Sequence, residues 1–189
     1  KFGSASGLFD GTGDCLTLVD GDDFNFGTGD FTIEEWVRFS TVSGSQRLIG
    51  QSNITGNGNF SWAIQLNSSK IYALVSFDGT TFGITLISTT TLVADTWYHI
   101  EFSRNGNNFN LFINGVIEDT DVSSSALYDS TSILAIGRQG LYDSEYFNGW
   151  MDELRISKGI AIHTANFTPR TSAYSASTIF LTSSLSESR

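Results

Sequence analysis

The chain has 189 residues, a formal net charge of −10 at pH 7, 40% hydrophobic residues and one proline. This length and apolar content suit one domain with a sizeable core rather than a disordered tail. A chain this acidic is not expected to bind nucleic acid or anionic lipid, since both favour basic patches. The single cysteine, Cys15, excludes a disulfide within the chain and a cysteine zinc cluster. No apolar run approaches membrane-spanning length, so we expect no membrane insertion.

Short stretches that alternate apolar and polar residues follow one another along the chain, which predicts β-strands. In chain order they are Phe31 to Phe39, Arg47 to Ser52, Phe60 to Leu66, Lys70 to Phe77, Phe82 to Ile87, Tyr98 to Phe102, Phe109 to Ile113, Val116 to Asp119, Ile133 to Gly137, Tyr146 to Ser157 and Thr178 to Thr182. Turn residues separate several of them, and the pairs Asn105-Gly106 and Asn114-Gly115 favour tight hairpins. At most one helical turn is expected, around Ile160 to Ala165. The pattern predicts an all-β fold, a two-sheet antiparallel sandwich in one domain covering residues 1–189.

The strand predicted from Tyr146 to Ser157 carries two adjacent acids, Asp152 and Glu153, in its middle. Successive strand residues point to opposite faces, so the two carboxylates do not share a face. Asp152 shares its face with Trp150 and Leu154, which predicts that it points toward the core. A buried carboxylate needs a cation or hydrogen-bond donors, because unpaired burial of a charge costs several kcal/mol or forces protonation.

Six blocks of the sequence resemble the laminin-G-like, concanavalin A-like jelly-roll family: KFGSASGLFDGTGDCLTL, FNFGTGDFTIEEWVRF, DTWYHIEFSRNGNNFNLFINGV, LAIGRQG, FNGWMDELRISKG and NFTPRT. The blocks occur in the order typical of that family and cover nearly the whole chain. They are most similar to the branch found as modules in large extracellular bacterial proteins and phage structural proteins. The resemblance implies a curved jelly-roll sandwich that serves in binding or adhesion, often to carbohydrate, on an extracellular, cell or virion surface. It also implies one module of a longer protein, with residues 174–189 as an extended C-terminal segment.

Many members of that family hold a calcium ion, and the resemblance implies a structural calcium site here as well. Its ligands would be Asp10 of the FDG block and Asp152 of the MDELRI block, with backbone carbonyls and water completing the oxygen shell. The alternative is that Asp152 accepts hydrogen bonds from backbone N–H groups of a neighbouring turn, without a metal.

A ligand-binding loop is predicted between Arg138 and Gly149, because loops at the end of a sandwich are common positions for binding sites. Aromatic rings stack against sugars while polar side chains bond the hydroxyl groups. The candidates for binding a glycan or other surface ligand are Arg138, Tyr142, Asp143 and Tyr146. The remaining large aromatic side chains are predicted to fill the core: Trp36, Trp62, Trp97 and Trp150, with Tyr146 as a further candidate.

Glu35 departs from the family pattern, because relatives usually carry an aromatic or small residue in that block. Alternation places it with Ile33 and Val37, at an inward or interface position where a charge needs a partner. Arg155, Arg38 and Lys158 are possible partners. The favoured interpretation is a position at the sheet edge that reaches water.

The chain is not predicted to be an enzyme. Glycoside hydrolysis needs two carboxylates that face one cleft, and the adjacent acid pairs point apart. A cross-strand pair such as Glu34 with Glu101 is conceivable but generic. The alternative to glycan binding is a structural module of a phage particle or extracellular fibre. Such a capsid or tail decoration would act through contacts with neighbouring copies or other modules of a larger assembly.

Overall fold

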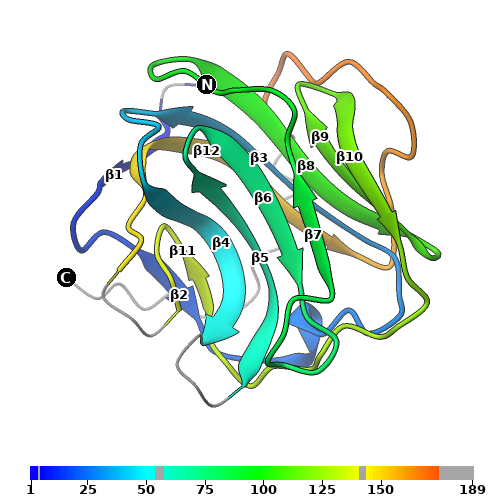
Figure 1. The fold of residues 1–189 in the computed structure, drawn as a ribbon. Coiled ribbons are helices and arrows are strands. Elements are labelled where there is room, and N and C mark those ends of the chain that lie inside the picture. The colour runs from blue at the N-terminus through cyan, green and yellow to red at the C-terminus, as the bar shows by residue number, and fades with distance from the viewer. Residues whose placement is uncertain (4, 54–57, 141–143, 175–189) are drawn as a thin grey trace.

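The computed structural model describes residues 1–3, 5–53, 58–140 and 144–174 (Figure 1). These residues form two antiparallel six-stranded sheets, which confirms the predicted sandwich. Sheet A has the order β1 (Gly7–Asp10), β12 (Asn148–Lys158), β3 (Phe31–Phe39), β8 (Trp97–Asn105), β9 (Asn108–Ile113), β10 (Val116–Val122). Sheet B has the order β2 (Leu16–Leu18), β11 (Leu134–Ile136), β4 (Ser45–Asn53), β5 (Asn59–Asn67), β6 (Lys70–Val75), β7 (Ile84–Ile87). In Figure 1, β4, β5 and β6 lie in front of β3 and β12.

The hairpins arise from turn residues that accept positive φ. Asn114 and Gly115 have φ values of 51° and 78° and join β9 to β10, as the Asn-Gly pair predicts. Ser68 and Ser69 have φ values of 50° and 66° and join β5 to β6. The only helix among the described residues is the short 3-10 helix η1 (Asp22–Phe24). The helical turn expected around Ile160 to Ala165 does not form.

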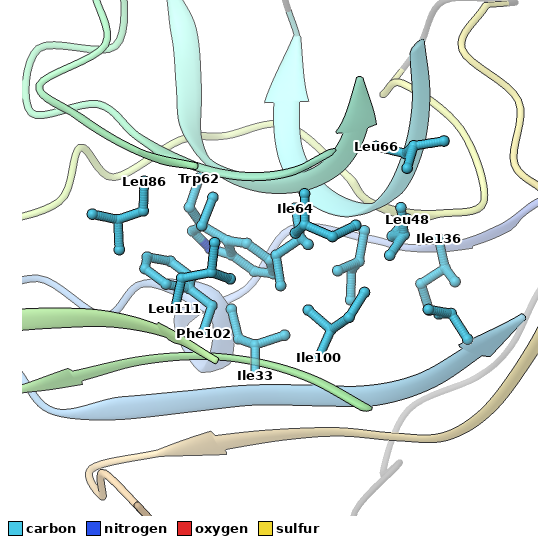
Figure 2. Packing of buried hydrophobic residues seen from close by; sticks show 14 of the residues in the cluster. Ile33, Leu48, Trp62, Ile64, Leu66, Leu86, Ile100, Phe102, Leu111 and Ile136 are labelled. Atoms are coloured by element: carbon cyan, nitrogen blue, oxygen red, sulfur yellow. The ribbon is translucent and has the colours of Figure 1, made fainter. Parts of the chain in front are cut away.

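The core lies between the two sheets and is filled by apolar side chains from both (Figure 2). Trp62 of β5 packs there together with Ile33 of β3 and Ile100 of β8 (Figure 2). The prediction that all four tryptophans fill the core is wrong. The other three, on β3, β8 and β12, are only partly buried and lie on the outer face of sheet A: Trp36, Trp97 and Trp150. The residue that follows each of them points to the core, namely Val37, Tyr98 and Met151, so strand alternation turns the tryptophans outward.

The face predicted for Asp152 is also wrong, because β12 contains a β-bulge. Met151 lies opposite Val37 and Ile156 lies opposite Ile33, so both point to the core. Between them the register shifts from Asp152 to Arg155, and Glu153 has a φ of 53°. A bulge inserts one extra residue into one strand and reverses the alternation beyond it. Asp152 therefore points outward.

Candidate functional site

The loop predicted to bind a ligand connects β11 to β12 and closes on itself at its base. The N–H of Phe147 donates to the carbonyl of Gly137 at 2.8 Å. The N–H of Gly137 donates to the carbonyl of Leu48, on β4, at 2.8 Å. Within the loop, the N–H of Gln139 donates to the carbonyl of Ser144 at 3.2 Å. The base of the loop is thus closed, and its first residue is bonded to β4 of sheet B.

Glu145 anchors this loop to β4. Its carbonyl accepts the N–H of Arg47 at 2.8 Å, and its carboxylate accepts the Arg47 Nη2 at 3.1 Å and the hydroxyl of Ser45 at 2.9 Å. Burial lowers the pKa of Arg47, and the charge of Glu145 opposes that shift. Glu145 has a φ of 53°, an uncommon conformation for a residue with a side chain. Sequence reasoning missed both residues, since neither lies in a motif.

The structure places two of the four predicted ligand-binding residues. Arg138 and Tyr146 lie at opposite ends of the loop, and both are partly buried. Tyr142 and Asp143 lie outside the described residues. Tyr146 is followed by Phe147, which is fully buried in the core and contacts Phe9 and Phe39 edge to face. Tyr146 itself is not among the residues of the core.

The two predicted calcium ligands do not meet. Asp10 lies opposite Asn148 at the end of β1, four residues along β12 from Asp152, which corresponds to roughly 13 Å of extended strand. The Asp10 carboxylate accepts the N–H of Thr12 at 2.7 Å. Among the described residues, no group of three or more His, Cys, Asp or Glu side chains is arranged to hold a metal ion. The strand register thus separates Asp10 from Asp152 in this structure, and calcium binding itself stays a prediction.

Asp152 is partnered by nitrogen donors. Its carboxylate accepts hydrogen bonds from three backbone nitrogens: Lys1 at 2.6 Å, Phe2 at 2.7 Å and Glu153 at 2.9 Å. The neighbouring Glu153 carboxylate accepts the N–H of Tyr174 at 2.5 Å. The adjacent acids at the bulge thus hold residues from both ends of the described chain.

Glu35 lies on the core side of β3 and is 0% exposed. Neither carboxyl oxygen has a hydrogen-bond partner in the part of the chain that the structure describes. Burial raises its pKa to about 8. The interpretation of Glu35 as a water-exposed edge position is therefore wrong. The three suggested cations do not reach it: Arg155 bonds Glu34, Arg38 bonds Asp95, and Lys158 bonds the carbonyl of Asp22.

A laminin G model, described as the concanavalin A-like lectin/glucanases superfamily, matches residues 10–165. No curated protein sequence matches the chain. Among solved structures, domains LG4-5 of the mouse laminin alpha1 chain are 20% identical, with a TM-score of 0.63, over 80% of this chain and 40% of that chain. A candidate carbohydrate-binding protein from Bacteroides ovatus is 15% identical, with a TM-score of 0.64, over 82% of this chain and 44% of that chain.

A third similar structure is the ligand-binding domain of botulinum neurotoxin serotype D in complex with N-acetylneuraminic acid. It is 13% identical, with a TM-score of 0.63, over 85% of this chain and 43% of that chain. The chain therefore spans less than half the length of these three structures. At these identities the likeness supports the shared sandwich fold.

Proposed function

The chain belongs to the concanavalin A-like lectin/glucanases superfamily, and from that premise we propose that it is a non-catalytic module that binds glycans. The proposed setting is an extracellular, cell or virion surface. No helix among the described residues is long and apolar enough to cross a membrane. The Bacteroides ovatus structure is described as a candidate carbohydrate-binding protein, and the serotype D toxin domain is complexed with a sugar acid. These neighbours support a carbohydrate ligand for this fold.

The observation that carries the proposal is the fixed base of the loop between β11 and β12. Binding loops are most effective when a rigid scaffold holds them, because less conformational entropy is lost on binding. The Arg47–Glu145 ion pair and the closed base supply that rigidity. Arg138 offers hydrogen-bond donors to sugar hydroxyls, and Tyr146 offers an aromatic ring and a hydroxyl.

A catalytic role is less favoured, for a reason of geometry. The cross-strand pair Glu34 and Glu101 is buried, and His163 bonds Glu101 from the segment that follows β12. A substrate would have to displace that segment to reach either carboxylate. Binding is also the role that the names of the similar structures describe.

A glycan array probed with the isolated chain tests this function. We expect binding to at least one oligosaccharide, weakened several-fold by Arg138→Ala or Tyr146→Ala, because a stacked aromatic contributes about 0.5–1.5 kcal/mol beyond its buried area. Phe82→Ala is the control, since Phe82 is exposed on the connection between β6 and β7. If no glycan binds and the loop is buried against a neighbouring subunit, a structural module replaces this proposal.

A further inference from the structure

Three planar side chains form a row across the outer face of sheet A. Trp150 of β12 lies opposite Arg38 of β3, and Arg38 lies opposite Trp97 of β8. All three are partly exposed. Leu8 of β1 lies opposite Trp150 and extends the row by one strand, and it is 61% exposed.

The row is held in a defined arrangement. The Arg38 guanidinium carbon lies 4.6 Å from the centre of the Trp150 ring, and Arg38 Nη2 bonds the Asp95 carboxylate at 2.8 Å. The N–H of Asp95 donates to the carbonyl of Phe39 at 2.8 Å, which fixes the loop before β8. Asp95 has a φ of 59°, and its side chain is 65% exposed. A polar residue held in the left-handed region and open to water is a candidate for a functional role.

Packing of the core does not account for these two tryptophans. Their neighbours Met151 and Tyr98 are the inward residues that contribute to the inter-sheet core. A third outward tryptophan, Trp36, is covered by Phe2, whose ring meets it edge to face at 5.7 Å. The structure describes no such aromatic cover over Trp97 or Trp150.

We propose that Trp150, Arg38, Trp97 and Asp95 form a platform that binds neutral oligosaccharides. This inference rests on the proposed glycan-binding function and adds a site on the outer face of sheet A, beyond the residues of the β11–β12 loop. Tryptophan rings stack on the apolar faces of sugar rings, while the guanidinium and carboxylate bond hydroxyl groups. The charge of Arg38 is matched by Asp95, so the row carries no net charge that would favour an anionic sugar.

The spacing of the row defines the size of the ligand. Trp150 and Trp97 are separated by two strand spacings, roughly 10 Å. One monosaccharide cannot cover both rings, whereas two sugar units of one chain can each stack on one of them. A row of rings across the sheet face suits an extended chain more than a branched terminal sugar.

The test measures binding of cellohexaose, mannohexaose and maltohexaose, with 3′-sialyllactose as the anionic probe, by isothermal titration calorimetry. We expect at least one neutral hexasaccharide to bind the wild-type chain. Trp97→Ala and Trp150→Ala should each weaken that binding roughly tenfold. Asp95→Ala should weaken it several-fold, and Phe82→Ala should leave it unchanged. Trp97→Phe keeps a stacking ring, so it should retain most of the affinity; it also serves if Trp97→Ala fails to fold.

The outcomes separate this inference from the function on which it rests. If an oligosaccharide binds and is lost in Arg138→Ala or Tyr146→Ala but not in the tryptophan variants, the platform is rejected and glycan binding stands. If only 3′-sialyllactose binds, the neutral-ligand assignment is rejected. If the wild-type chain binds none of these sugars and no glycan on the array, both the proposed glycan-binding function and the proposed platform are rejected.

Discussion

Glu34 and Glu101 lie directly opposite each other on β3 and β8, with exposed fractions of 2% and 0%. Glu34 bonds the Arg155 guanidinium, with Nε at 2.7 Å, and Glu101 Oε2 lies 2.7 Å from His163 Nδ1. Among the described residues, Arg155 is the only permanent cation bonded to either of these two buried carboxylates. His163 belongs to residues 160–174, the strap that crosses the outer face of sheet A after β12.

The two acids differ in pKa because their partners differ. Burial acts to raise the pKa of Glu34, but hydrogen bonds from His99 and Tyr174 and the charge of Arg155 lower it to about 2. Burial, followed by the charge of Glu34, raises the pKa of Glu101 to about 8. At neutral pH the facing pair therefore holds one proton on Glu101.

The strap is expected to loosen at alkaline pH. The pKa of Glu101 is higher in the folded state than its ordinary value of 4.5, so its contribution to stability is complete below 4.5 and lost as pH rises through about 8. No strap residue belongs to the inter-sheet core among the described residues, so local opening does not require global unfolding. Hydrogen exchange, corrected for intrinsic rates, should show protection of residues 160–174 falling between pH 7 and pH 9.

Glu101→Gln is the matched variant, because glutamine still bonds His163 but cannot lose a proton in this range. In this variant, the hydrogen-exchange protection of residues 160–174 should not change between pH 7 and pH 9. Equal loss of protection in the strap and in β5 of the wild-type chain would show global unfolding and contradict the prediction.

Glu35→Leu should stabilise the protein at neutral and alkaline pH. The raised pKa of Glu35 makes stability fall between pH 4.5 and about 8, by about 1.4 kcal/mol per pH unit for one proton. Leucine removes that dependence and fills a buried site with an apolar side chain. Urea denaturation at pH 5 and pH 8 should show a smaller difference for the variant than for the wild type. An unchanged difference would mean that Glu35 is not protonated in the fold.

Glu145→Ala should destabilise the protein on the order of 2 kcal/mol, because it leaves the buried Arg47 guanidinium without this carboxylate. Ser144→Ala is the control, since the exposed Ser144 hydroxyl bonds only Gln139 among the described residues. Thermal melting of the two variants gives the comparison. Similar melting temperatures would argue against Glu145 as the anchor of the loop.

The family resemblance implies calcium at Asp10 and Asp152, but the separation of these residues along β12 argues against one ion shared by both. Because Asp152 is already bonded by Lys1 and Phe2, we expect EDTA to leave the melting temperature unchanged. A bound ion would instead raise the melting temperature with calcium concentration by mass action. If calcium raises the melting temperature of the wild-type chain but not that of Asp152→Asn, calcium binding at Asp152 is supported.

The sandwich could be predicted from the sequence because its signals are local. Alternation along β3 and β8 identifies the strands, and Asn114-Gly115 fixes a hairpin through backbone angles that few other residues accept. The position of the β11–β12 loop also followed from chain order. Its anchor Glu145 could not be predicted, because the partner Arg47 lies on a strand about a hundred residues earlier.

The tertiary structure alone decided which face each residue of β12 occupies. The bulge after Asp152 depends on how β12 pairs with β3, and the local sequence pattern does not predict it. The same pairing sets Trp150 beside Arg38 and Trp97 on the outer face, where composition alone would place large aromatics in the core. The sequence determined which segments become strands, because backbone preference acts between near neighbours. The assembled sheets determined burial and charge, because both depend on side chains that only folding brings together.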